Sequence, residues 1–214
     1  TNHSNYRFTS WYQSKNKRYQ NFFVVVGNKL ISGENGGIKE NGNYLDSGAY
    51  ADSRFNIPTK LGPLQQASRN FFSTNIATGT FNTNATYLMR QQYDLGQKDS
   101  IVVNDTTVIP LFYPRVRFEH SISYNTYKYR FSDNHADPGY YKENYSINFP
   151  SQPDTFFRRD FWKELLNDFS VYQFPDAKNS QQFIKVGASF QRLQGDFDTG
   201  LVKNSYTNLW LHGE

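Results

Sequence analysis

Hydrophobic and polar residues alternate with a period of two along four segments of the chain. These segments are residues 6–14, 81–95, 112–130 and 182–192. In residues 81–95, hydrophobic residues such as Tyr87 and Met89 alternate with polar residues such as Thr86 and Arg90. Successive side chains of a β-strand point to opposite faces. The pattern therefore predicts four strands, each with one hydrophobic and one polar face.

Three further segments have the β-branched and aromatic content of strands but a less regular alternation. They are residues 18–31, 161–174 and 202–214. Residues 161–174 are ambiguous, because Phe161, Leu165 and Phe169 also lie at helical spacing. We interpret this segment as a strand. The chain is thus predicted to be all-β, with about seven strands.

The connections between these segments alternate between short and long. Residues 15–18 and 175–180 are short, whereas residues 32–80, rich in Gly, Asn and Ser, and residues 131–160 are long. Long loops without secondary structure are uncommon in compact soluble domains. Transmembrane β-barrels, by contrast, have short periplasmic turns and long extracellular loops. The alternation favours a transmembrane antiparallel β-barrel, with residues 32–80 and 131–160 as extracellular loops.

Two other connections and the aromatic clusters fit the same topology. We place residues 96–110, of intermediate length, on the periplasmic side and the Gly/Asp turn at residues 194–201 on the outer side. Aromatic girdles mark the two interfaces of a membrane barrel. Aromatic residues gather near both ends of the 112–130 strand, which predicts such girdles. They are Phe112 and Tyr113 at one end, and Tyr127, Tyr129, Phe131, Tyr140 and Tyr141 at the other.

The composition is that of a folded chain. Aromatic residues make up 18% and charged residues only 20%, which argues against disorder. The longest apolar stretch, residues 22–27, is far shorter than the roughly 20 residues of a membrane-spanning helix. The mean hydropathy of −0.76 is compatible with a barrel that has a polar lumen and polar loops. A secreted β-sandwich, whose hydrophobic face is simply its core, is the alternative that these patterns leave open.

Motifs for catalysis, metals and nucleic acids are not evident. Without cysteine, the chain has no disulfide, thiolate ligand or thiol nucleophile. The spacing of His3, His120, His135 and His212 matches no zinc site. Residues 133–137 lack the ordered ligand spacing of a calcium loop. Lysine and arginine are dispersed despite the pI of about 9.1. We expect no enzyme activity, cofactor, metal or nucleic-acid partner.

Four sequence segments carry a resemblance to a known family. They are Tyr12-Gln-Ser-Lys-Asn-Lys-Arg-Tyr19, Glu34-Asn-Gly-Gly-Ile38, the strand at residues 84–96, and Phe112-Tyr-Pro-Arg115. Together they resemble the putative porin family of Bacteroidetes outer membranes. Barrels of TonB-dependent transporters are similar in these features. The resemblance to either family rests on strand and turn patterns and includes no catalytic signature.

The resemblance implies where the chain belongs and how it is organised. Residues 1–214 would form part of a single barrel domain in the outer membrane of a Gram-negative bacterium, as an internal fragment of a longer chain. About seven strands of a larger barrel would be present, since complete bacterial barrels have an even number. The implied function is a channel segment that passes small hydrophilic solutes. The alternatives are the barrel of a TonB-dependent transporter and a soluble sandwich that binds glycans through exposed aromatic residues.

The alternation also predicts which residues face the pore and which face the membrane. The candidate pore-lining residues are Arg7, Arg90, Asp94, Arg115, Arg117, Glu119 and Lys185. Their excess of positive charge predicts a mild preference for anionic or neutral solutes, with Arg115 and Arg117 contributing most. In the alternative, these cations pair with acids from loops or from other strands, and the pore is neutral.

The opposite row of the 112–130 strand ends in two cations. Lys128 and Arg130 are predicted to reach the lipid interface and contact lipopolysaccharide phosphates. Outer-membrane lipids, lipopolysaccharide and small hydrophilic solutes are therefore the expected partners, with other outer-membrane proteins as further candidates.

Overall fold

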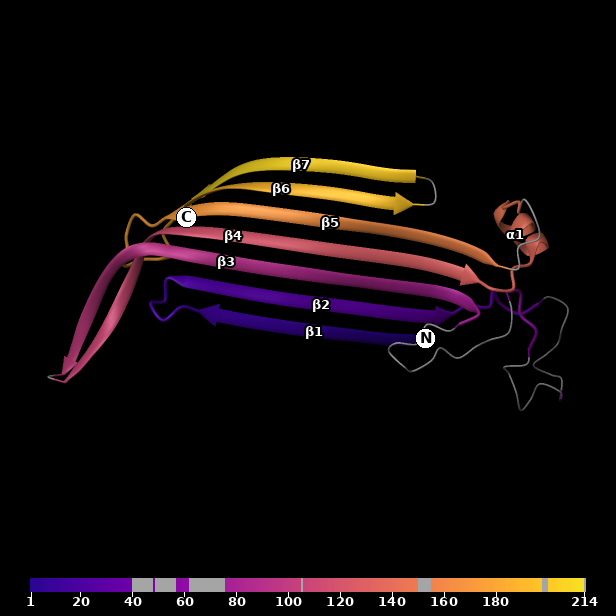
Figure 1. Ribbon diagram of the computed structural model, residues 1–214, viewed down its shortest axis with the longest axis horizontal. Helices are drawn as coiled ribbons and strands as arrows, with labels where there is room; N and C mark the ends of the chain where they lie inside the picture. Colours follow the sequence, from indigo (N-terminus) through magenta and orange to yellow (C-terminus); the bar gives the residue numbers. More distant parts are fainter. Residues whose placement is uncertain are drawn as a thin grey trace.

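The computed structural model describes residues 1–39, 48, 57–61, 76–104, 106–149, 155–197 and 200–213. The described strands form one antiparallel seven-stranded sheet, in which each strand pairs with the next along the chain (Figure 1). The strands are β1 (Asn2–Gln13), β2 (Tyr19–Gly33), β3 (Thr78–Asn104), β4 (Thr107–Asp133), β5 (Phe156–Gln173), β6 (Ile184–Phe197) and β7 (Gly200–Gly213). The all-β prediction is confirmed, and the ambiguous segment at residues 161–174 is a strand.

The sheet is a single open layer with β1 and β7 at its edges. The sandwich alternative requires a second sheet packed on the hydrophobic face. The strands in the described ranges instead all belong to one sheet, so the described part of the chain is not a sandwich. An open, meandering antiparallel sheet is the arrangement expected for part of a barrel wall.

The connections between the strands lie at the two opposite ends of the sheet. The turns β1–β2, β3–β4 and β5–β6 lie at one end, which we call the short-turn end, and the connections β2–β3, β4–β5 and β6–β7 lie at the other, the long-loop end (Figure 1). The predicted loops at residues 32–80 and 131–160 connect at the long-loop end. Much of the first and part of the second lie outside the described residues.

The prediction of a loop at residues 96–110 is wrong. β3 and β4 continue through this region as a hairpin that extends beyond the neighbouring strands and bends away from them (Figure 1). Cross-strand pairs of β-branched residues, Ile101 with Ile109 and Val102 with Val108, occupy its tip. Such pairs stabilise a two-stranded ladder.

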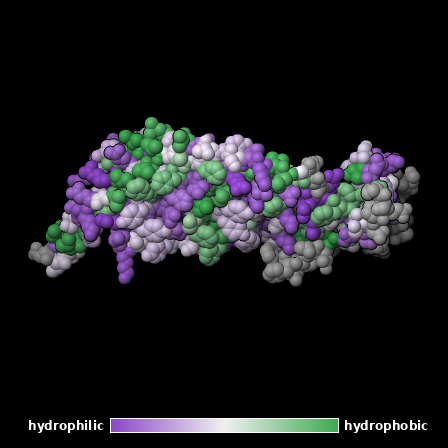
Figure 2. All heavy atoms as spheres, turned by 45° about the horizontal axis from the view of Figure 1, so that its top comes forward, coloured by the Kyte–Doolittle hydropathy of each residue, from purple (hydrophilic) through white to green (hydrophobic). Residues whose placement is uncertain are grey.

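The register assigns every strand residue to one of two faces, because directly opposed residues share a face. Tyr87 of β3 is paired with Val25 of β2 and Tyr124 of β4, so these residues lie together. We call their side of the sheet the apolar face. Exposed hydrophobic members of this face are Phe8, Tyr87, Phe118, Phe169, Val186, Leu209 and Leu211. Figure 2 shows hydrophobic side chains gathered toward the β6–β7 corner of the sheet.

The other side, which we call the polar face, carries Arg90, Asp94, Arg117 and Glu119. Although the described strands form no second layer over it, Asp94 and Glu119 are only 4% and 7% exposed. Neighbouring side chains of the same face therefore crowd around them. The polar face is therefore crowded, whereas the apolar face is exposed. This asymmetry is expected when a sheet curves with its polar face on the inside.

At the long-loop end, Asp133 anchors the connection between β4 and β5. This fully buried carboxylate accepts hydrogen bonds from the Thr78 hydroxyl (2.9 Å), the Tyr141 hydroxyl (2.9 Å) and the His135 backbone N–H (3.0 Å). Burial and the Asp133 carboxylate raise the pKa of Tyr141, which keeps its hydroxyl a donor. One acid thus joins β3, β4 and the following loop.

Tyr141 belongs to a short helix that the sequence patterns did not predict. α1 (Pro138–Tyr145) begins after Asp137, whose side chain accepts a hydrogen bond from the Gly139 N–H. An Asp N-cap followed by proline is a recognised start signal. It was missed because the helix lacks a periodic hydrophobic face. In the described part of the chain, no helix is long and apolar enough to span a membrane.

Replacing Tyr141 with Phe tests this anchor. Tyr141→Phe removes one of the three hydrogen bonds to a buried carboxylate, which costs about 1–3 kcal/mol. We expect amide hydrogen exchange in residues 134–149 to accelerate about tenfold or more. The control is Tyr145→Phe, which removes the same atom from a side chain that is 59% exposed. Equal exchange in both variants and the wild type would show that the hydrogen bond from Tyr141 to Asp133 does not hold the loop.

Candidate functional site

A row of alternating polar groups crosses the polar face near the short-turn end. Asp94 of β3, Arg117 of β4, Tyr172 of β5 and Lys185 of β6 are successive cross-strand partners. Their positions follow directly from the register, since each is opposed to the next. The structure thus brings four strands together in one electrostatic network.

Two carboxylates organise this network. Asp94 receives a bidentate interaction from Arg117, with distances of 2.7 Å from Nε and 3.1 Å from Nη2. Glu119 accepts from Arg90 Nη2 at 2.5 Å and lies 3.8 Å from Lys185 Nζ. Bidentate and charge-assisted contacts of this kind are the stronger ones in proteins. Five of the seven predicted pore-lining residues are therefore paired through contacts that fix their side chains.

Aromatic side chains shape the surroundings of Lys185. Its Nζ lies 4.7 Å from the centroid of the Tyr172 ring and 4.5 Å from that of Trp210. These distances are within the range of cation–π attraction. The Trp210 indole fits because Gly187 has no side chain, since a Cβ there would lie 2.3 Å from the ring. The hydroxyl of Tyr172 also donates to Glu119 at 3.3 Å.

β5 adds acidic residues to the polar face that the prediction of excess positive charge did not count. Asp160, Glu164 and Asp168 alternate along the strand on this side. Glu164 accepts hydrogen bonds from Asn125 at 3.0 Å and from Gln191. β5 thus adds acids, together with the cation Arg158, to the charges counted from the four clearest strands. β5 was omitted from the charge count because its alternation was ambiguous.

Arg7 and Arg115 are not part of the network. Arg7 lies on β1, at the edge of the sheet, and shares the polar face with Val26. Arg115 falls where the β3–β4 register shifts, and its Nη1 donates to the Pro175 carbonyl at 3.3 Å. A bulge re-aims the side chains around it. The structure therefore does not place Arg115 beside Arg117 as the regular alternation predicted.

Lys128 and Arg130 lie on the apolar face, opposite the network. Their cross-strand partners on β5 are Phe161 and Arg159. Arg130 stacks on Phe81, with Cζ 3.9 Å from the ring centroid. The face assignment of these two cations thus agrees with the alternation from which they were predicted.

The apolar face also carries a hydrogen-bonded row of polar side chains. His120 lies between Gln91 and Asn167, with ring nitrogens 3.0 Å from Gln91 Nε2 and 2.8 Å from Asn167 Oδ1. Gln91 in turn accepts from the Tyr19 hydroxyl at 3.1 Å. Polar groups in an apolar solvent need such internal partners. His120 is therefore a structural residue whose ring nitrogens both have hydrogen-bond partners.

The prediction that Tyr127, Tyr129 and Phe131 belong to an outer girdle of aromatic residues is wrong. In the register, these residues share the polar face with Arg117 and Glu119. Girdle residues would have to lie on the opposite side. The sequence indicated their place on the polar face, because their odd-numbered positions continue the polar row of this strand.

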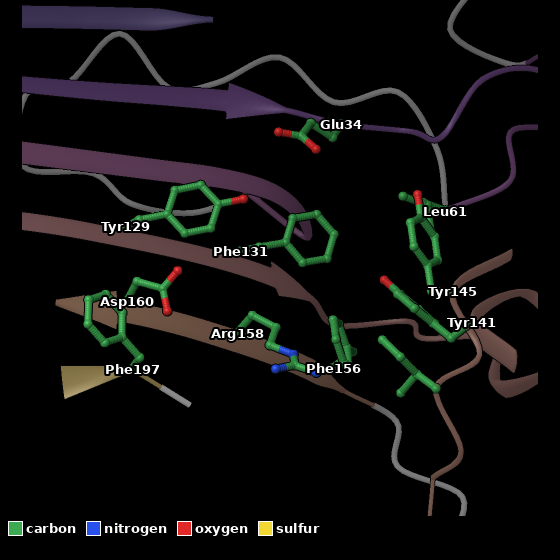
Figure 3. A pocket seen from close by; sticks show the side chains of 11 residues that line it. Glu34, Leu61, Tyr129, Phe131, Tyr141, Tyr145, Phe156, Arg158, Asp160 and Phe197 are labelled. Carbon is green, nitrogen blue, oxygen red and sulfur yellow. The ribbon is translucent and has the colours of Figure 1, made fainter. Parts of the chain in front are cut away.

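Tyr129 and Phe131 instead line a pocket at the long-loop end of the polar face (Figure 3). Its volume is about 600 Å³. β4, β5 and β6 form one side and the loop containing α1 contributes another. The residues that line it are Glu34, Leu61, Tyr129, Phe131, Tyr141, Tyr145, Ile147, Phe156, Arg158, Asp160 and Phe197. We call this the mouth pocket; it was not predicted, because its members come from six separate segments.

The described residues offer no evident metal site. No group of three or more His, Cys, Asp or Glu side chains within them is arranged to hold an ion.

An antiparallel meander with one exposed apolar face and one charged, crowded face defines the wall of a transmembrane β-barrel. Residues 1–209 match the family described as Putative porin, and the chain belongs to this family. No match is found among curated proteins or among solved structures. The family resemblance is thereby confirmed, and it supports a porin-like outer-membrane channel in general.

Proposed function

We propose that the chain forms part of a channel that passes small hydrophilic solutes across the outer membrane of a Gram-negative bacterium. The observation that carries this proposal is the separation of the two faces. Charged groups on the polar face are paired by the register, while hydrophobic side chains on the other face are exposed. A polar lumen and a hydrophobic lipid-facing surface are the defining requirements of such a channel.

The paired charges favour weak ion selectivity. Asp94 and Glu119 neutralise Arg117 and Arg90 in place, so the wall presents alternating charges and no single-sign ring. Rings of one sign are what give pores strong selectivity. We therefore propose a channel for neutral and weakly charged solutes, in place of the anion preference expected from the four clearest strands alone.

The short-turn end faces the periplasm and the long-loop end faces outward in this proposal. Lys128 and Arg130 then lie on the lipid-facing side toward the outer leaflet, where lipopolysaccharide phosphates are the available anions. Their cationic side chains can snorkel to this interface and form charge-assisted hydrogen bonds with phosphate.

Conductance in planar bilayers tests the channel function. The full-length protein should form open pores with a reversal potential near zero under a salt gradient. Glu119→Gln removes the acid shared by Arg90 and Lys185, so anion permeability relative to cations should rise by about fivefold or less. The control is Asp196→Asn on the apolar face, which should change nothing. No conductance, or equal shifts in both variants, would contradict the proposal.

Lipopolysaccharide retention tests the outer-leaflet contact. The double variant Lys128→Gln/Arg130→Gln should purify with about half or less of the wild-type lipopolysaccharide, because two phosphate contacts are lost. Quantification of lipid A per mole of protein measures this. Arg7→Gln, which removes a cation from the polar face, should leave retention unchanged. Unchanged retention in the double variant would argue against the contact.

A further inference from the structure

The mouth pocket combines flat aromatic rings with charged groups in a regular pattern. Tyr129 of β4 is opposed to Asp160 of β5, and Phe131 is opposed to Arg158. Each pair places a ring beside a charged side chain on the polar face. Figure 3 shows these four side chains close together, with Glu34 across from them. The pattern is set by the strand register and is therefore built into the wall.

We propose that the mouth pocket binds a pyranose unit of an oligosaccharide. The inference rests on the proposed function for its location, since it places the pocket at the outer end of the pore. A volume of about 600 Å³ lies within the range of pockets that hold small molecules. One or two sugar rings fill such a space.

The rings supply the apolar half of the recognition. A pyranose has a face of C–H groups, and these groups pack against the negatively charged face of an aromatic ring. Tyr129 is 40% exposed, so its ring is accessible from the polar face. Phe156 and Phe197 line the same pocket from β5 and β6. A sugar can therefore contact more than one ring.

The charged and hydroxyl groups supply the polar half. Carboxylates are acceptors only and guanidinium is a donor only, whereas tyrosine hydroxyls do both. Neighbouring sugar hydroxyls can match a carboxylate or a guanidinium with two hydrogen bonds. Asp160 and Arg158 alternate on β5, and Glu34 is held in place by a hydrogen bond from the Thr80 hydroxyl. Donors and acceptors are thus both present around the rings.

The same groups disfavour other ligands. A purely hydrophobic ligand would desolvate Glu34, Arg158 and Asp160 without providing hydrogen bonds, which is costly. A quaternary ammonium ion would suit the aromatic rings, but it has no hydrogen-bonding group to offer Glu34, Arg158 or Asp160 in the lining. A neutral ligand with many hydroxyls satisfies all three charged groups.

The loop wall of the pocket is held before any ligand binds. The Tyr141 ring packs against that of Phe156, with centroids 4.5 Å apart, and its hydroxyl donates to buried Asp133. Side chains that are already fixed lose less entropy on binding. The pocket is therefore preorganised on the side that the loop provides.

Binding to the purified full-length protein tests the proposal. The probes are maltohexaose, cellohexaose, xylohexaose and mannohexaose, with tetramethylammonium as the cationic comparison. Calorimetry measures affinity, and interruptions of single-channel current measure binding from the long-loop side. Tyr129→Ala and Asp160→Asn should each weaken binding of the preferred hexaose about tenfold. Tyr206→Ala removes a 48% exposed tyrosine from the polar face of β7, outside the pocket, and should leave binding unchanged.

The outcomes separate this inference from the proposed function. Binding that depends on Tyr129 and Asp160 but not on Tyr206 supports the pocket, even if the protein forms no pore. A conducting channel that binds none of the hexaoses overturns the inference and leaves the channel function intact. Preferential binding of tetramethylammonium, or hexaose binding unaffected by both pocket variants, also overturns it.

Discussion

The continuous backbone hydrogen bonding of seven antiparallel strands is the constraint on which this structure depends. A bilayer offers no partners for backbone N–H and C=O groups, so a wall that crosses it must pair them between strands. The pairing fixes the register, and the register fixes the face of every side chain. A slip of one residue would move each side chain to the opposite face. On β4, such a slip would exchange Glu119 with Phe118 or His120.

The register therefore also decides where functional groups meet. It aligns Asp94 and Arg117 into a paired network toward the short-turn end and aligns Tyr129 with Asp160 toward the long-loop end. Glu119 and Tyr129 lie about 33 Å apart along the same strand at the usual rise per residue. A solute that crosses along this face would meet aromatic rings first and paired charges later. In the proposed channel, recognition at the mouth pocket and passage along the paired charges would therefore occur at different heights of one wall.

Much of this arrangement could be predicted from the sequence, because strand periodicity is a local property. Four strands and the faces of Glu119 and Lys128 follow from alternation, and β-branched and aromatic content indicates the other three strands. The length of the β3–β4 hairpin could not be predicted in this way. Its cross-strand partners, such as Ile101 and Ile109, can be identified only once the strands are paired. The displaced contact of Arg115 depends on a bulge, which shifts the register locally.

The mouth pocket could not be predicted for a different reason. Its lining joins strand residues with Glu34, Leu61 and residues of α1, which are far apart in sequence. Periodicity places Tyr129 on a face but does not indicate which loops close over it. The buried contact between Asp133 and Tyr141 likewise depends on the path of the loop.

Accessibility along β4 tests the central claim that the polar face meets water and the apolar face meets lipid. The chain has no cysteine of its own, so single cysteines can replace Phe118, Ser121, Ile122 and Ser123 in the full-length protein in liposomes. The account predicts that a membrane-impermeant, hydrophilic maleimide labels the variants at positions 121 and 123 and that a lipid-soluble one labels those at 118 and 122. The reverse pattern, or labelling without alternation, would contradict it.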